Sequence, residues 1–497
     1  GAPAADGAYT AGIELRYVQG NRPAARSLPF TLDTQAPRAE LSAPFTLFSP
    51  NGDGRRDFIP FTVSTDGNDE WEAAIVDAGN RPIKTWRWTG RAPDLIWDGT
   101  DQAGNSAPDG TYALELRSTD EAGNSARMAV TGISLDSRIP RVFLTAAPAA
   151  IAPKPGRDGA AAEPVRGEQV RFGIICSIQD GVEAWRLELK DGDGRILRSF
   201  SGENTAPPAN IGWDGLSGDG VVREGLYTPV LTVSYVKGDL VSTQAPPILV
   251  DVSGPALSYR SRPEYFSPDN DGADDELIIN LGAQDASPIA SWSLEIREPR
   301  PPYPVFYRIE GRSSPAAEII WDGRSNTGAS GGELVQAATD YPFTYRAADA
   351  LGNASSMEGV IGVDVLVIRD GDRLKIQVPS IIFRENAADF TTLNAETVDN
   401  NLRVLRRIAE ILNKFRDYKV QVEGHANPVL RTDAEERNEL QPLSEARARA
   451  VVNMLVEFGV LRNRLSSVGM GGKRPVVRYE DRNSWWKNRR VEFILVK

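Results

Sequence analysis

The chain has 497 residues and a formal net charge of −12, with one cysteine and one histidine. At ~100–200 residues per domain, this length predicts three to five domains. A single cysteine excludes an intramolecular disulfide, and a single histidine argues against a Ser-His-Asp triad or a multi-histidine zinc site. No apolar run approaches the ~18 residues of a membrane-spanning helix, so we expect no membrane-spanning segment.

The charge is divided unevenly along the chain. From Arg373 onward there are 23 Lys and Arg and 16 Asp and Glu, a net charge of +7, which leaves −19 for the preceding residues. An acidic front joined to a basic end favours different partners at the two ends, although two solvated surfaces of unlike composition would give the same numbers. The near-absence of cysteine is compatible with an oxidising periplasm.

The first 37 residues match only the closing half of a repeat that returns further along the chain. Gly7-Ala8-Tyr9 aligns with Gly110-Thr111-Tyr112, and the strands that should precede the first of these are absent. Half a sandwich cannot bury its sheet face, so either the chain has been trimmed or residues 1–37 pack on their neighbour, and we expect trimming. The chain begins without a charged or apolar leader, so we expect that any signal peptide was removed or never included.

A repeat of roughly one hundred residues follows. Each copy contains the tripeptide Trp-Asp-Gly followed by an aromatic strand, and copies are separated by an Asp with a Pro four residues later. The motif FSPNGDG at Phe48–Gly54 returns as FSPDNDG at Phe266–Gly272. The tripeptides start at Trp97, Trp213 and Trp321, and the Asp/Pro pairs are Asp33/Pro37, Asp136/Pro140 and Asp251/Pro255.

The segments between these marks alternate polar and apolar residues, as in Tyr112–Leu116, and are bounded by Gly, Asp, Asn and Pro. This pattern is typical of short antiparallel strands, and about seven strands per hundred residues make a β-sandwich. The pattern resembles the FlgD-type immunoglobulin-like repeats of bacterial envelope and extracellular proteins. The resemblance implies a partial repeat at 1–37 and tandem all-β Ig-like sandwiches at 38–138, 139–254 and 255–366. The second sandwich is degenerate because it lacks FSPNGDG.

Two Asp-rich turns, one in the first copy and one in the third, each bring several side-chain oxygens together, where calcium could bind. The turns lack the Glu that an EF-hand loop needs at its twelfth position. The same side chains could instead cap their own backbone amides. We therefore expect no cofactor apart from a possible structural calcium. The oxygens belong to Asn51, Asp53 and Asp57 in the first turn and to Asp269, Asp271 and Asp275 in the second.

The Trp residues of the Trp-Asp-Gly tripeptides have two possible roles. They could form platforms on which sugars stack. An aromatic residue at this spacing more often fills a sandwich core, with Asp-Gly forming the turn that follows, and we expect that role.

Helical periodicity begins only after residue 390. Apolar residues from Val398 to Phe415 recur at three- and four-residue steps, which predicts an amphipathic helix. A second helix is expected to start with Ser444 as its N-cap. Together with five strands, residues 367–497 are predicted to form a β-α-β-α-β domain, with both helices on one face of a small mixed sheet. The predicted strands are Leu374–Val378, Ile381–Phe383, Lys419–Glu423, Leu465–Val468 and Arg490–Val496.

Three motifs follow one another in this domain: VEGHAN at Val422–Asn427, LSEARARAVV at 443–452 and NRRVEF at 488–493. In order and spacing they resemble the OmpA-like C-terminal domain, the periplasmic module by which bacteria bind peptidoglycan. In that family an Asp after the second strand holds the ammonium of the diamino acid in the stem peptide, and an Arg in the second helix holds its carboxylate. The resemblance places these roles at Asn427 and Arg447.

The chain departs from the family pattern at Asn427, where the family has Asp. A charge-assisted hydrogen bond is worth roughly 1.5–3 kcal/mol and a neutral one about half that, so the exchange should lower affinity on the order of tenfold. Leu440 also replaces a frequent Asn, whereas Asp433 or Glu435 could restore the charge. The predicted ligand-binding set is Asn427, Arg447, His425 and Ser444, although the position of His425 favours packing.

No segment offers a nucleophile elbow, a P-loop, a Cys/His pair or paired carboxylates in an α/β or barrel context, and no RNA-binding motif accompanies the basic end. The sequence therefore predicts a non-enzymatic periplasmic protein of the cell envelope that does not bind nucleic acid. Its OmpA-like domain would contact the peptidoglycan stem peptide, and its Ig-like repeats would act as spacers towards other envelope proteins. The alternative is a protein-interaction scaffold whose OmpA-like domain has lost peptidoglycan binding.

Overall fold

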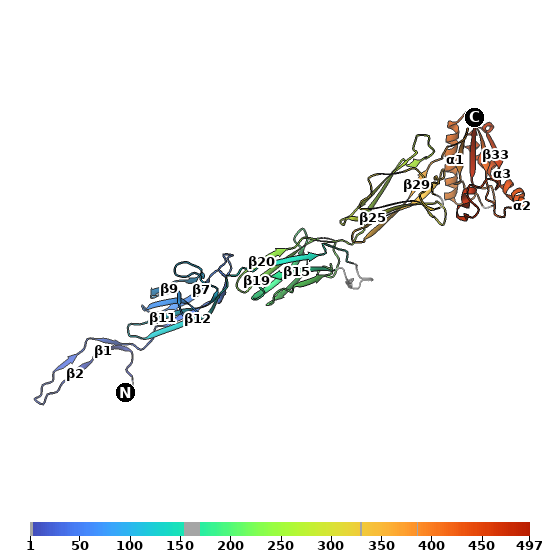
Figure 1. Cartoon of the computed structure of the whole chain (residues 1–497). Helices are drawn as coiled ribbons and strands as arrows, with labels where there is room; N and C mark the ends of the chain where they lie inside the picture. Colours follow the sequence, from blue (N-terminus) through green and yellow to red (C-terminus); the bar gives the residue numbers. More distant parts are fainter. Residues whose placement is uncertain (1–2, 154–168, 329–330, 385) are drawn as a thin grey trace. The chain divides into compact units, whose positions relative to one another are not determined.

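The computed structural model of the chain (Figure 1) describes residues 3–153, 169–328, 331–384 and 386–497. Part of the second predicted sandwich, residues 154–168, therefore lies outside the described residues. The chain forms two compact units, Gly1–Val250 and Asp251–Lys497. Within the described ranges, no helix combines the length and the apolarity needed to cross a membrane.

The first unit opens with four short strands. β1 (Gly7–Tyr9) pairs with β4 (Phe30–Leu32), and β2 (Gly12–Glu14) pairs with β3 (Ala24–Arg26), both antiparallel. Nearly all side chains of these strands are exposed, including the apolar Ile13 and Phe30. These strands therefore pair with one another but bury little apolar surface.

Each of the three repeats that follow contains two sheets that share one buried core. In the first repeat, β5 (Ala39–Ser42), β7 (Ile59–Thr65) and β10 (Leu95–Trp97) form one sheet. The other contains β6 (Leu47–Phe48), β8 (Glu70–Asp77), β9 (Pro82–Thr89), β11 (Gly110–Thr119) and β12 (Ser125–Leu135). Along β11 the side chains alternate between buried and partly exposed, as expected of a strand with one face towards a core.

The second and third repeats use the same division into a small and a large sheet. In the second, β13 (Val142–Ala147), β15 (Val170–Cys176) and β18 (Asn210–Trp213) form the small sheet. Its large sheet contains β14 (Ala150–Ile151), β16 (Val182–Lys190), β17 (Ile196–Glu203), β19 (Gly225–Tyr235), β20 (Leu240–Gln244) and β21 (Ile248–Val250). In the third, β22 (Ala256–Arg262), β24 (Leu277–Gln284) and β27 (Ile319–Trp321) form the small sheet. Its large sheet contains β23 (Tyr265–Phe266), β25 (Ile289–Arg297), β26 (Val305–Arg312), β28 (Asp340–Asp349) and β29 (Ala354–Val363).

The Trp-Asp-Gly tripeptide closes the core of each sandwich. Trp97 is fully buried, and its indole donates to the backbone oxygen of Thr100 at 3.0 Å. Asp98 accepts from the amide of Thr100, and Gly99 has φ +76, a conformation that favours glycine. The prediction that these Trp residues fill cores is confirmed, because a buried ring cannot stack on a sugar. The equivalent indole bonds join Trp213 to Leu216 and Trp321 to Arg324.

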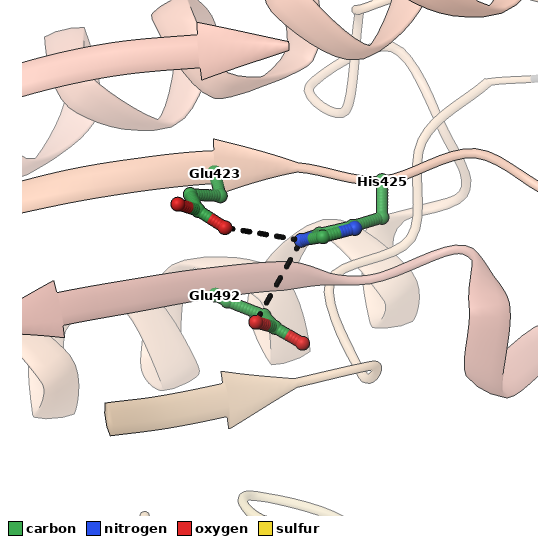
Figure 2. Close-up of side chains that lie close together, drawn as sticks. All are labelled: Glu423, His425 and Glu492. Carbon is green, nitrogen blue, oxygen red and sulfur yellow. Dashed lines mark ion pairs between the residues drawn. The ribbon is translucent and has the colours of Figure 1, made fainter. Parts of the chain in front are cut away.

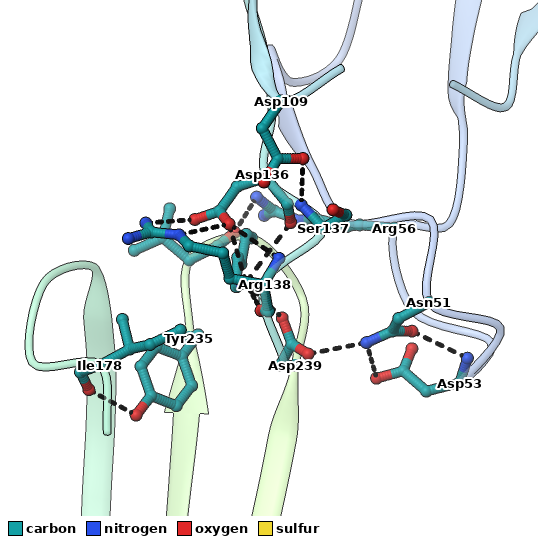
Figure 3. A network of polar contacts seen from close by, with 12 residues as sticks. Asn51, Asp53, Arg56, Asp109, Asp136, Ser137, Arg138, Ile178, Tyr235 and Asp239 are labelled. Carbon is teal, nitrogen blue, oxygen red and sulfur yellow. Dashed lines mark hydrogen bonds and ion pairs between the residues drawn. The ribbon is translucent and has the colours of Figure 1, made fainter. Parts of the chain in front are cut away.

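A buried lysine, Lys237, holds the linker between the first two sandwiches, and Figure 3 shows three residues that it contacts, Asp136, Arg138 and Asp239. Lys237 lies in the turn after β19 and is only 4% exposed, with its ammonium 3.3 Å from Asp136 and 3.5 Å from Asp239. The same ammonium donates to the backbone oxygen of Arg138. Hydrogen bonds from Arg138 lower the pKa of Asp136 to about 2. Asn51 donates to Asp239 at 2.7 Å, so the first Asp-rich turn also joins this network.

The last domain is a five-stranded mixed sheet in the order β30-β31-β34-β32-β33, in which only β32 and β33 are parallel. Helices α1 (Ala395–Lys414) and α3 (Gln441–Glu457) contribute to one core with the sheet. The predicted β-α-β-α-β order is present as β31-α1-β32-α3-β33, with β30 before it and β34 after it. The strands are β30 (Ile368–Asp370), β31 (Arg373–Val378), β32 (Lys419–Gly424), β33 (Leu465–Gly469) and β34 (Val491–Val496).

Two local predictions for this domain are wrong. Ile381–Phe383 form no strand, because the side chain of Asn401 on α1 accepts from the amide of Ile382 and donates to its carbonyl. Ser444 is not an N-cap, because α3 already begins at Gln441 and continues from the π-helix η3 (Glu436–Leu440). Ser444 therefore lies inside the helix.

Candidate functional site

A cleft of about 340 Å³ lies beside Asn427, the last residue of the VEGHAN motif. One wall is the loop that leads from β32 to α3, and the other is the segment that precedes β34. Both walls thus come from connections at the ends of strands, where functional groups commonly gather. Among the described residues, the cleft is lined by Asn427, Pro428, Arg431, Thr432, Asp433, Glu435, Glu436, Leu440, Gly472, Lys473, Pro475, Val477, Tyr479 and Asn488.

The loop wall is shaped by Glu435, on the one-turn helix α2 (Asp433–Glu435). Its carboxylate accepts from the backbone amides of Val429, Leu430 and Arg431 at 2.7–2.9 Å. Burial opposes ionisation, but these donors outweigh it and lower the pKa of Glu435. Glu435 is thus committed to the loop backbone, and the prediction that it could replace the missing charge at position 427 is not supported by this geometry.

Asn427 is 9% exposed and lines the cleft. Its Nδ2 donates to the carbonyl of Pro428 at 3.2 Å, and its Oδ1 accepts from Nδ2 of Asn488 at 2.8 Å. Asn488, on the short helix α4 (Trp485–Asn488), also accepts from the amides of Val476 and Val477 with its Oδ1. One buried side chain therefore ties Asn427 to the opposite wall of the cleft.

Arg447 is 8% exposed, and its guanidinium faces the segment before α1. Its Nε donates to the carbonyl of Ala387 at 3.0 Å and its side chain lies 5.0 Å from the ring centre of Phe383. Burial, together with the charge of Arg489, lowers the pKa of Arg447 to about 10. Arg447 does not line the cleft at Asn427, and no hydrogen bond joins the two side chains within the described residues.

Ser444 is fully buried next to the cleft wall. Its hydroxyl donates to the carbonyl of Gln441 at 3.0 Å and accepts from the amide of Gly471 at 2.9 Å. These bonds fasten α3 to the loop that follows β33. Ser444 thus has a structural task in the fold, and its place in the predicted ligand set remains a prediction.

His425 lies in a buried charge cluster (Figure 2). Its Nε2 is 3.7 Å from a carboxylate oxygen of Glu423 and 3.7 Å from one of Glu492. Neither ring nitrogen of His425 has a hydrogen-bond partner in the part of the chain that the structure describes. Burial, followed by the charge of Arg490, lowers its pKa to about 4, so the ring is neutral at pH 7. This burial agrees with the packing role that the motif favours.

The same three residues have the composition of a metal site, with one ligand atom each within 4.8 Å of the others. Three cationic side chains already neutralise the two carboxylates: Arg490 is 2.6 Å and Lys375 2.8 Å from Glu492, and Arg474 is 3.5 Å from Glu423. A divalent cation would be repelled by these charges. The cluster is therefore better described as a buried ion network that joins β31, β32 and β34.

Residues 382–489 match the family model described as OmpA family. This segment is an OmpA-family domain. The chain is 36% identical over 87 residues to a peptidoglycan-associated lipoprotein of Mesorhizobium japonicum. The matched segment covers 18% of this chain and 49% of the lipoprotein. It is 31% identical over 101 residues to the peptidoglycan-binding protein ArfA of Mycobacterium bovis, which covers 20% of this chain and 29% of ArfA.

Among solved structures, the periplasmic domain of Helicobacter pylori MotB is 20% identical with a TM-score of 0.22, covering 26% of this chain and 78% of that chain. The chain spans about half of the lipoprotein and less of ArfA. The two sequence relatives are named as a peptidoglycan-associated lipoprotein and as a peptidoglycan-binding protein.

Sequence reasoning missed two residues of the OmpA-family domain that shape the cleft. Asn488 is the first residue of the NRRVEF motif, so the motif points to this residue. The spacing of the motifs along the chain does not show that Asn488 contacts Asn427. The sequence indicates Glu435 only as a carboxylate that could restore the charge missing at position 427, and not as a residue that holds the loop backbone. The π-helix η3 also inserts an extra residue before α3 and places Leu440 in the cleft wall, at the position expected for an Asn.

The Asp-rich turns of the sandwiches are held by their own backbone. Asp57 accepts from the amides of Gly52 and Gly54 at 2.7 Å, and Asp275 accepts from two amides in the same way. In the third repeat the carboxylates of Asp269, Asp271 and Asp275 also lie within 4.8 Å of one another, and burial raises the pKa of Asp269. Amide capping accounts for both turns, and calcium at these residues remains a prediction.

Proposed function

We propose that the chain is a non-enzymatic periplasmic protein of the cell envelope whose OmpA-family domain contacts the peptidoglycan stem peptide through Arg447, with the cleft at Asn427, which Arg447 does not line, as a second contact. The proposal draws on the relatives, which are named as peptidoglycan-associated and peptidoglycan-binding proteins. It rests above all on Arg447, which is a nine-tenths buried cation with no carboxylate partner among the described residues. A buried, unpaired charge is costly, and the carboxylate of a bound diamino acid would offset that cost.

The ammonium of the ligand would be bound more weakly than its carboxylate. At Asn427 the side-chain oxygen already accepts from Asn488, and it carries no negative charge. Glu436 also lines the cleft, but its Oε2 accepts from the amide of Gly472, and its Oε1 lies 3.8 Å from the ammonium of Lys473. We therefore expect a ligand held mainly through its carboxylate, with an affinity on the order of tenfold below that of a site with Asp at 427.

The sandwiches would act as spacers and as contact surfaces for other envelope proteins. Their strands reach 10 or 11 residues in β11, β12 and β19, which corresponds to ~33–36 Å at ~3.3 Å per residue. The residues before Arg373 carry the net charge of −19 and the domain after it carries +7. This asymmetry favours different partners for the two parts of the chain.

The experiment that tests the proposal is sedimentation of the full chain with purified cell-wall sacculi. We expect the wild type to pellet with the sacculi and Arg447→Gln to stay in the supernatant, because the substitution keeps a polar amide donor but removes the positive charge. Arg449→Gln is the matched control, since Arg449 lies on the same helix with its side chain 60% exposed. Equal pelleting of the wild type and a folded Arg447→Gln variant would refute the proposed site.

A second function is favoured by two residues at the cleft. Asn427 lacks the negative charge and Leu440 lacks the amide that the resembled pattern has at these positions. With both polar groups altered, the domain would serve as a protein-interaction scaffold that has kept the fold and lost wall binding. The same assay separates the two functions: a wild-type chain that stays soluble, together with an Asn427→Asp variant that pellets, would identify a disabled site.

A further inference from the structure

A buried ion pair connects the OmpA-family domain to the third sandwich. Lys487 on α4 is 2% exposed, and its ammonium lies 3.0 Å from Oε1 of Glu298 and 2.7 Å from Oε1 of Glu333. Glu298 follows β25, and Glu333 lies between β27 and β28, so both carboxylates belong to the sandwich. All three residues lie within the second compact unit of the chain.

This ion pair differs from the other contacts between the same two domains. Arg407 pairs with Asp364 at 2.7 Å and Arg403 with Asp340 at 3.4 Å, but both arginine side chains are about half exposed. Exposed pairs contribute about 0–1 kcal/mol and tolerate many geometries. Lys487 is surrounded by protein instead, and the two carboxylates outweigh burial and raise its pKa. Because an ammonium in such a place needs its partners at hydrogen-bond distance, the pair fixes the position of Lys487.

Fixing Lys487 also fixes the next residue. Asn488 is buried and its side chain makes three bonds at the cleft: it donates to Asn427 on the opposite wall and accepts from the amides of Val476 and Val477 on its own wall. α4 has only four residues, so its own helical bonds cannot hold it in place. Its position therefore depends on tertiary contacts, and the shortest charged contacts of α4 go to the sandwich.

We propose that the third sandwich is a working part of the ligand-binding cleft: Glu298 and Glu333 hold Lys487 so that Asn488 keeps Asn427 and the 476–477 backbone in binding geometry. This rests on the proposed function of the cleft, and it assigns the sandwich a positioning task beyond that of a spacer. Glu298 and Glu333 are positioning residues that touch no ligand. The consequence is that substitutions more than 90 residues before Asn427 in the sequence alter recognition of the stem peptide.

The test uses the full chain and two readouts, binding to sacculi and amide hydrogen exchange. We expect Glu298→Gln/Glu333→Gln and Lys487→Met each to weaken binding by roughly tenfold, because the cleft loses its preorganisation. The same variants should accelerate exchange of the Val476 and Val477 amides at least tenfold. Arg407→Gln, which removes an exposed pair between the same domains, should leave both readouts unchanged.

The two readouts separate the two proposals. A wild-type chain that does not bind sacculi would refute the proposed function, while the exchange measurement would still decide whether the sandwich organises the cleft. Unchanged exchange at Val476 and Val477 in a folded Glu298→Gln/Glu333→Gln variant would overturn the positioning role. Where Lys487→Met fails to fold, the double Gln variant alone carries the decision, since its side chains keep the size of the originals.

Discussion

The side-chain amide of Asn488 donates to the side-chain oxygen of Asn427 at 2.8 Å, across the cleft of the OmpA-family domain. The bond uses the acceptor that Asn427 would otherwise offer to an ammonium group. The other polar side-chain atom of Asn427, Nδ2, donates to the carbonyl of Pro428 and cannot attract a cation. The residue is thus built into the fold and contributes no charge to recognition.

Asn427→Asp should strengthen binding to sacculi by about tenfold. One oxygen of the new carboxylate can accept from Asn488 while the other accepts a charge-assisted hydrogen bond from the ammonium of the ligand. Sedimentation at fixed ionic strength measures the change. Asn453→Asp is the control, since Asn453 is exposed on α3 and adds the same charge outside the cleft. Equal or weaker binding of Asn427→Asp would show that position 427 does not face the ligand.

Gly424→Ala should destabilise the OmpA-family domain by about 3 kcal/mol or more. A Cβ at this position would lie 2.1 Å from the carbonyl oxygen of Ser444, so α3 would have to move away from β32. Protection of the α3 amides against hydrogen exchange reports the loss. Gly192→Ala is the matched control, because a Cβ there meets no atom within 4 Å. Undiminished protection in Gly424→Ala would mean that the helix can shift without loss of stability.

The sequence predicted the elements in which a regular pattern of apolar residues continues along the whole element and shows which side faces the core. α1, β32, β33 and β34 lie within a residue or a few of the predicted bounds. Ile381–Phe383 failed because a three-residue apolar run reads the same in a strand as in an extended segment. What decides its structure is the side chain of Asn401, nearly twenty residues away on α1. The start of α3 failed because the preceding π-helix shifts the register that the Ser444 cap assumed.

The candidate site was predictable in its residues but not in its geometry. The motifs placed Asn427 and Arg447 in one domain. In the structure Arg447 donates to the carbonyl of Ala387, and Asn427 accepts from the side chain of Asn488. Such partners are set by the way in which loops of unlike length cross the end of the sheet. Spacing along the chain carries no information about that crossing.

Lys237→Met should lower the free energy of unfolding of the first unit by about 3 kcal/mol, because it leaves Asp136 and Asp239 without the buried ammonium between them. Urea unfolding of the full chain, followed by proteolysis at the 136–141 linker, measures the effect. Arg138→Gln is the comparison: the arginine side chain is 63% exposed, and its loss should cost less than about 1 kcal/mol. Equal effects of the two substitutions would contradict the role given to Lys237.

Asp275→Ala should destabilise the third sandwich by about 1–3 kcal/mol whether or not calcium is present, because its carboxylate caps the amides of Asn270 and Gly272. The thermal midpoint is compared in millimolar calcium and in chelator. A destabilisation that appears only with calcium would establish the metal site at Asp269, Asp271 and Asp275 and displace the capping interpretation.

Stability of the OmpA-family domain should fall between pH 6.5 and pH 4 because of His425. The pKa of this residue is about 4 in the folded chain against a usual value of 6.5, since burial and the charge of Arg490 oppose its protonation. The unfolded chain therefore binds a proton in this interval that the folded chain does not. The contribution of His425 is fully present above pH 6.5 and is lost as the pH falls through 4, by up to about 3 kcal/mol.

His425→Gln separates this contribution from that of the carboxylates, which also titrate in acid. The amide keeps a polar group between Glu423 and Glu492 but has no proton to gain. Urea unfolding at several pH values from 4 to 7 should show a shallower slope for the variant, and the difference between the two curves should grow towards pH 4. Parallel curves would mean that His425 is protonated in the folded domain, and the ion network around it would then contain a fourth cation.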